Sequence, residues 1–109
     1  MAPRIPDVPS IPVTEAHDLA ESGDAVILDV RESDELETKS IDGALHLPLS
    51  EMRDRYTELP EDKQLLVICE SGVRSAFVTE MLQQSGYQDT VNISGGMQAW
   101  QGAGLPLKR

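Results

Sequence analysis

The chain has 109 residues, the length of one domain, and 39% of them are hydrophobic, which is enough for a small core and too much for a disordered chain. Nineteen acidic residues against nine Lys and Arg give a formal net charge of −10. This charge argues against nucleic-acid binding and against a polybasic membrane anchor, because both need clustered cations.

The acidity is uneven: residues 1–60 carry a net charge of −9 and residues 61–109 a net charge of −1. No apolar run reaches membrane-spanning length, and prolines interrupt the N-terminus, so we expect neither a membrane segment nor a signal peptide. With a single cysteine, Cys69, the chain forms no internal disulfide, and its two histidines lack metal-ligand spacing. These features predict a cytoplasmic protein without a metal site.

The first sixty residues predict an extended arm followed by short strands and helices. Residues 1–10 are Pro-rich and are expected to lie outside a domain that comprises residues 11–109. The predicted elements that follow are an edge strand at Ile11 and Val13, a helix capped by Thr14 and ended by Gly23, a strand over 25–30, one or two helical turns capped by Ser33, a strand over 44–48, and a helix from Ser50 to about Tyr56.

The second half repeats this alternation. Its predicted elements are a strand over 65–69, a loop over 70–74, a helix from Ser75 to Gly86, a strand over 90–93, a turn at 95–96, and a helix from Met97 that buries Trp100. The strands at 25–30 and 65–69 are mostly continuous apolar runs, which is typical of parallel strands buried on both faces. The sequence thus predicts an α/β domain with a mainly parallel sheet and helices on both faces.

Cys69 ends the second long apolar strand, immediately before a short loop and a helix. Ligands of open α/β sheets bind at the carboxyl ends of strands, and a strand-to-helix loop can turn its N–H groups toward an anion. Inside such a loop the anion can be the thiolate itself. Gly72 permits a backbone conformation that a side chain would hinder, and Arg74 adds a positive charge. Cys69 is therefore a candidate nucleophile, whereas a lone cysteine elsewhere is usually a core residue.

Short motifs are spread along the chain in a fixed order. They are Leu28-Asp29-Val30-Arg31-Glu32, Ile41-Asp42-Gly43-Ala44 with Leu47-Pro48-Leu49, Cys69-Glu70-Ser71-Gly72-Val73-Arg74-Ser75, Gly86-Tyr87, Gly95-Gly96 with Ala99-Trp100, and Ala103-Gly104-Leu105-Pro106. In order and spacing they resemble the motifs of the rhodanese family of sulfurtransferases. The resemblance covers roughly residues 11–107 and implies a rhodanese-like fold with a five-stranded, mainly parallel sheet.

The resemblance also implies a function. Cys69 would take the outer sulfur of a donor such as thiosulfate, carry it as a persulfide, and pass it to cyanide or a cellular thiol, without a metal or an organic cofactor. The residues implied for the loop that binds the sulfur anion are Glu70, Ser71, Gly72, Val73, Arg74 and Ser75, with structural support from Asp29, Arg31, Gly95 and Gly96.

The chain departs from the family pattern at two places. Glu70 follows the cysteine where the family often has a basic or polar residue, and Lys39-Ser40 replace a Gly-His pair. We expect Glu70 either to point into solvent or to pair with a cation such as Arg74. Cysteine phosphatases place five residues between cysteine and arginine, whereas this loop has four, a ring that suits a sulfur atom better than a phosphate.

Two other functions remain open beside the enzyme. The chain can be a rhodanese-fold binding or regulatory module, or a sulfur-relay carrier that receives sulfur from a protein donor or gives it to a protein acceptor. Both would use the acidic stretch Glu32, Asp34, Glu35 and Glu37 as the docking face, which is otherwise expected to be solvated.

Overall fold

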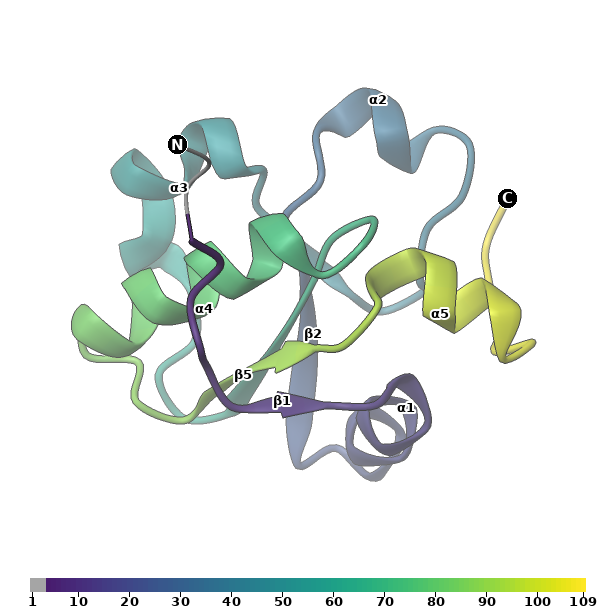
Figure 1. Ribbon diagram of the computed structural model, residues 1–109, viewed down its shortest axis with the longest axis horizontal. Helices are drawn as coiled ribbons and strands as arrows, with labels where there is room; N and C mark the ends of the chain where they lie inside the picture. Colours follow the sequence, from purple (N-terminus) through teal and green to yellow (C-terminus); the bar gives the residue numbers. More distant parts are fainter. Residues whose placement is uncertain (1–3) are drawn as a thin grey trace.

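The computed structural model describes residues 4–109 and consists of a five-stranded parallel sheet with helices on both faces (Figure 1). The strands are β1 (Ser10–Ile11), β2 (Ala25–Asp29), β3 (Leu45–His46), β4 (Gln64–Ile68) and β5 (Thr90–Ile93), in the spatial order β1-β5-β4-β2-β3. Every pair of neighbouring strands is parallel, which confirms the predicted fold class.

The helices are α1 (Val13–Ser22), α2 (Ser33–Leu36), α3 (Leu49–Arg55), α4 (Val73–Gln84) and α5 (Gly96–Gly102), with a 3-10 turn at Tyr56–Glu58. Helices α1 and α5 lie on one side of the sheet, and α3 and α4 on the other (Figure 1). Among residues 4–109 no helix is long and apolar enough to cross a membrane.

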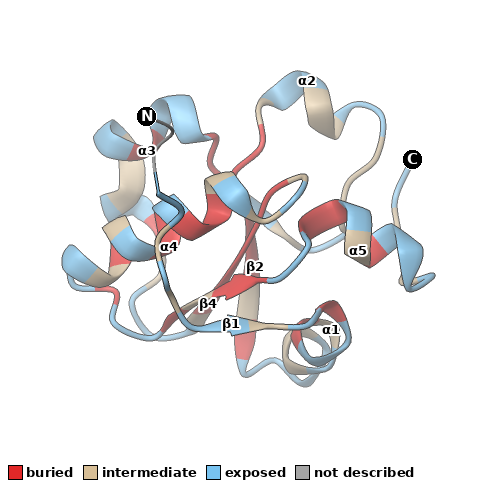
Figure 2. Ribbon diagram, in the orientation of Figure 1, coloured by how far each residue is buried: buried red, intermediate tan, exposed pale blue. Residues whose placement is uncertain are grey.

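The sheet separates two hydrophobic clusters, because alternate residues of a strand point to opposite faces. In β4, Leu65 and Val67 pack toward α3 and α4, whereas Leu66 and Ile68 pack toward α1 and α5. Figure 2 shows these central strands buried beneath the helices. Burial on both faces explains why β2 and β4 were recognisable as continuous apolar runs.

Several predicted boundaries are wrong by one or two residues. Helices α1 and α3 begin after Pro12 and Pro48, not after Thr14 and Ser50, because proline has no N–H that would remain unbonded at a helix start. Val13 therefore belongs to α1 and not to an edge strand. Three residues of the predicted arm, 1–3, lie outside the described range, and residues 4–9 form no helix or strand.

Candidate active site

Cys69 follows β4 directly, and its side chain lies beneath the loop that leads into α4. The backbone N–H groups of Gly72 and Ser75 donate to the sulfur, Sγ, over 3.1 and 3.3 Å, and the Ser75 hydroxyl lies 3.2 Å from it. The residue is only 1% exposed. Two N–H donors, a hydroxyl and the N-terminus of a 12-residue helix thus surround one sulfur atom, an arrangement that stabilises negative charge on it.

Glycines in two segments, the cysteine loop and the start of α5, allow the shape of the loop. Gly72 caps α4 with a φ of 98°, in the left-handed region that side chains rarely adopt, and a Cβ there would lie 3.1 Å from the backbone nitrogen of Gly95. At Gly96 a Cβ would collide with the carbonyl groups of Cys69 and Glu70. These glycines therefore let the start of α5 approach the cysteine loop closely.

The start of α5 also holds the loop by hydrogen bonds. The N–H of Met97 donates to the carbonyl oxygen of Cys69 over 2.8 Å, and the N–H of Gln98 donates to that of Glu70 over 3.1 Å. On β5, the Asn92 amide nitrogen lies 3.4 Å from the Gly72 carbonyl oxygen. Sequence reasoning missed Asn92, although a polar residue between Val91 and Ile93 in a short strand was a signal.

Arg74 forms a two-fold hydrogen-bonded ion pair with Glu35 of α2. Its two Nη atoms each donate over 2.8 Å to one carboxylate oxygen. These hydrogen bonds lower the pKa of Glu35 from its usual 4.5 to about 2 and raise the pKa of Arg74. Arg74, named above as one possible partner of Glu70, thus pairs with Glu35 instead, because α2 presents a better-placed carboxylate.

Glu70 instead faces two other cations. Its carboxylate oxygens lie 3.9 Å from Nη1 of Arg31 and 4.0 Å from Nζ of Lys39, and its side chain is 34% exposed. Lys39 also donates to the side-chain oxygen of Gln101 on α5. Sequence reasoning had named Lys39 only as a departure from the family pattern, so its place at the rim of the site is new information.

Asp29 and Arg31 form a buried ion pair beneath this rim, with each side chain 1% exposed. Arg31 donates to both carboxylate oxygens of Asp29 and to the carbonyl oxygens of Glu35 and Lys39. His46 contacts the carbonyl oxygen of Arg31 over 2.7 Å. Asp29 and Arg31 thus hold the segment between β2 and β3 against the cysteine loop.

The acidic stretch 32–37 is only partly the solvated face that its composition predicts. Glu35 pairs with Arg74, and the Glu32 carboxylate accepts hydrogen bonds from the backbone and hydroxyl of Ser50. Glu32 also caps α2 in a reciprocal arrangement with Glu35, so Ser33 is not the cap. The other predicted loop residues, Ser71 and Val73, are exposed beside Cys69.

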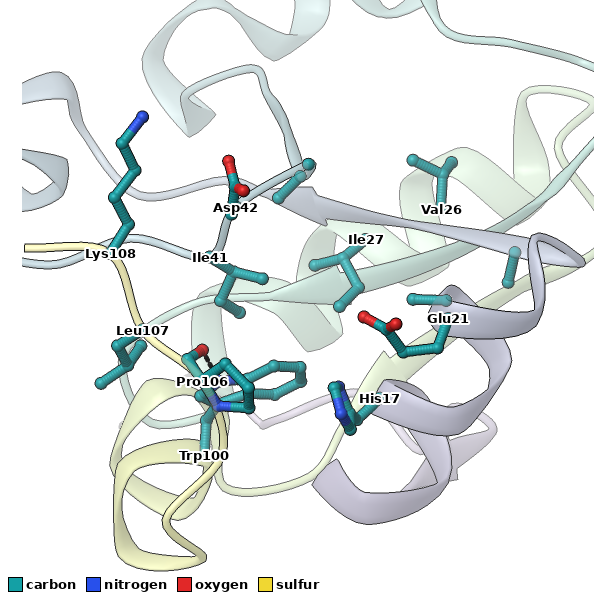
Figure 3. Close-up of a pocket in the computed structure, with 14 residues that line it drawn as sticks. His17, Glu21, Val26, Ile27, Ile41, Asp42, Trp100, Pro106, Leu107 and Lys108 are labelled. Atoms are coloured by element: carbon teal, nitrogen blue, oxygen red, sulfur yellow. Dashed lines mark hydrogen bonds between the residues drawn. The ribbon is translucent and has the colours of Figure 1, made fainter.

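A cavity of about 720 Å³ lies away from Cys69 and is lined by residues of α1, β2, the loop before β3, α5 and the C-terminal segment (Figure 3). Trp100 forms part of its wall, yet is 1% exposed and donates its ring N–H to the Pro106 carbonyl, so we read Trp100 as a core residue. None of the predicted site residues lines this cavity. Residues 4–109 contain no cluster of three or more His, Cys, Asp or Glu side chains suited to a metal ion.

Comparison with known proteins gives consistent matches. Residues 12–103 match the family model of the rhodanese-like domain. A protein of Allochromatium vinosum named a sulfurtransferase is 36% identical over 82% of this chain and 83% of its own. A Bacillus subtilis protein named as a proposed sulfur carrier is 40% identical over 70% of this chain, which spans only 41% of that relative. A rhodanese-related protein of Thermoplasma volcanium superposes with a TM-score of 0.86 at 36% identity, covering 92% of this chain and 97% of its own.

Proposed function

The chain belongs to the rhodanese-like domain family, and from this premise we propose that it is a sulfurtransferase whose Cys69 carries sulfur as a persulfide. The observation that carries the proposal is the environment of the Cys69 sulfur, which the N–H groups of Gly72 and Ser75 and the Ser75 hydroxyl contact at 3.1 to 3.3 Å. These groups are fixed before the reaction and point at the atom on which negative charge resides. The relatives named as a sulfurtransferase and as a sulfur carrier support the same chemistry.

The reaction has two balanced steps. The Cys69 thiolate attacks the outer sulfur of a donor such as thiosulfate, so that an S–S bond forms to Cys69 while the S–S bond of thiosulfate breaks and sulfite leaves. A thiophilic acceptor, cyanide or a thiol, then attacks the terminal sulfur of the persulfide and restores the Cys69 thiolate. Residues 70–75, the loop and the first residues of α4, serve both steps, because the negative charge remains on sulfur throughout.

The test combines turnover with intact mass. We expect wild-type protein incubated with thiosulfate to gain about 32 Da, the mass of one sulfur atom, and to release it as thiocyanate when cyanide is added. Cys69→Ser should lose both signals, whereas Ser85→Ala, at the exposed far end of α4, should keep both. A wild-type protein that neither gains this mass from any sulfane donor nor forms thiocyanate refutes the proposal.

A sulfur-relay carrier is the second candidate, because two large apolar side chains lie exposed beside the cysteine loop. Val73 and Phe77 are 40% and 39% exposed and stand one turn apart on α4, where a partner protein can reach both. The predicted acidic docking face is reduced to Asp34 and Glu37, since Glu32 and Glu35 bond within the chain. A carrier should transfer sulfur slowly to small acceptors and quickly to a protein thiol. Phe77→Ser should slow the transfer to the protein thiol.

A further inference from the structure

Three cations surround the Cys69 loop, and each of them faces a carboxylate. Arg31 pairs with Asp29 at 2.8 Å, Arg74 pairs with Glu35 at 2.8 Å, and Lys39 faces Glu70 at 4.0 Å. The charges of these six side chains therefore cancel. With the Cys69 thiolate added, the rim and floor of the site are net negative by one charge.

The cancelled charges leave little to bind an anionic headgroup. Thiosulfate delivers its outer sulfur together with a sulfonate, and the molecule carries two negative charges. A sulfonate is bound best by an arginine or lysine with free donors. Here the Arg74 fork is occupied by Glu35, and Arg31 is buried against Asp29. Glu70, which follows the nucleophile directly in the chain, is 34% exposed at the rim, beside the partly exposed and paired Arg74 and Lys39.

The Glu70 side chain lies between two cations, and its backbone is bonded to α5. Its two carboxylate oxygens each face a different cation, and the backbone carbonyl of Glu70 accepts the N–H of Gln98. Lys39 in turn donates to Gln101 and offers its own carbonyl to Arg31. The Glu70 carboxylate therefore lies at the rim of the site, between Arg31 and Lys39 and one residue from the nucleophile.

We propose that Glu70, positioned by Lys39, is a specificity-determining residue that disfavours dianionic donors and selects the terminal sulfur of a persulfide. This inference rests on the proposed function. In the transfer step, the Cys69 thiolate attacks the terminal sulfur of R–S–SH, the S–S bond of the donor breaks, and R–S⁻ leaves as the new persulfide forms on Cys69. The proton stays on the transferred sulfur or passes to the leaving thiolate. Such a donor brings at most one negative charge to the loop and no sulfonate.

The experiment measures how fast Cys69 gains one sulfur from each of two donors, thiosulfate and cysteine persulfide, by intact mass over time. Glu70→Gln removes the carboxylate charge and keeps the shape. We expect it to raise the rate constant for thiosulfate roughly threefold to tenfold, the effect of one nearby charge in a well-solvated site, and to change that for the persulfide less than about twofold. Lys39→Met removes a positive charge that faces the Glu70 carboxylate, so it should lower the thiosulfate rate constant by a similar factor.

Glu61→Gln is the matched control, because it removes the same charge from an exposed residue that precedes β4, whereas Cys69 follows the other end of that strand. It leaves the ratio of the two rate constants unchanged. Raised salt increases the thiosulfate rate constant of the wild type and has less effect on Glu70→Gln. The inference is overturned if both donors load the wild type but neither Glu70→Gln nor Lys39→Met changes the ratio of the thiosulfate and persulfide rate constants. The proposed function would still stand in that case. A wild type that neither donor loads overturns both.

Discussion

At the scale of single residues, the site depends on how each charge is compensated. The Cys69 sulfur accepts two backbone N–H groups, and the nearby side-chain cations pair with carboxylates. The hydrogen bonds from Arg74 lower the pKa of Glu35 to about 2, which makes this carboxylate a source of stability. The loop itself thus supplies the donors for the sulfur, and the side chains hold the loop in position.

The Glu35–Arg74 pair predicts a pH dependence of stability. Since the folded pKa of Glu35, about 2, lies below its usual 4.5, its contribution is complete above about pH 4.5 and is lost as the pH falls toward 2. Glu35→Gln should therefore lower the free energy of unfolding at pH 7 by about 1 kcal/mol, a value reduced by solvent screening of a partly exposed pair. Urea unfolding of both proteins between pH 7 and pH 2 measures the difference, which should shrink over the lower part of this range. A difference that stays constant contradicts the prediction.

At the scale of elements, the β4–α4 loop is held from α2 and from α5. The adjacent strands β2 and β4 end at the same edge of the sheet, so α2, which follows β2, reaches Arg74 at the start of α4. The start of α5 donates to the carbonyl oxygens of Cys69 and Glu70. The shape of the loop therefore depends on segments far from it in the sequence.

Gly96→Ala tests this dependence on α5. The new Cβ would collide with the carbonyl groups of Cys69 and Glu70 at a φ of 57°, so we expect a loss of about 2 kcal/mol or more of stability and slower sulfur loading of Cys69. Gly102→Ala in the same helix is the control, because its Cβ meets nothing within 4 Å, and its stability should stay equal or rise slightly. Thermal unfolding and the mass assay measure both variants. Equal behaviour of the two variants would argue against the contact.

At the scale of the whole molecule, we propose that the packed domain begins near residue 10, as the sequence predicts. The strand β1 pairs with β5, and the N–H of Asn92 donates to the carbonyl oxygen of Pro9. Before this point, Ile5 is 53% exposed, so residues 4–8 add little to the core. Most of the buried apolar surface belongs to the two clusters on the faces of the sheet.

Two truncations test this boundary. Removing residues 1–8 leaves β1 and the Pro9 hydrogen bond intact, so the Tm should fall by less than about 5 °C, which corresponds to about 1 kcal/mol or less for a chain of this size. Removing residues 1–12 deletes the edge strand β1 and the Pro12 cap of α1, so it should lower the Tm clearly more than the shorter truncation does. Thermal unfolding measures both. Equal losses from the two truncations would place the boundary earlier in the chain.

The architecture was largely predictable from local sequence patterns. Continuous apolar runs at 25–30 and 65–69 predicted the two central strands, since burial on both faces removes polar alternation. The alternation of strands and helices predicted the parallel sheet. The placement of Cys69 at the end of a buried strand before a glycine-containing loop indicated the candidate site. Helix starts were less predictable, because proline and serine both suit the first turn.

Local patterns were enough to predict the main elements and the position of the cysteine, because both depend on residues close together in the chain. Which charges meet depends on how the chain folds. Glu35 and Arg74 are 39 positions apart, and the two departures from the family pattern, Lys39 and Glu70, face each other at 4.0 Å. The physical reason is the strand order, which places the carboxyl ends of β2 and β4 side by side and brings the segments that follow them together around Cys69.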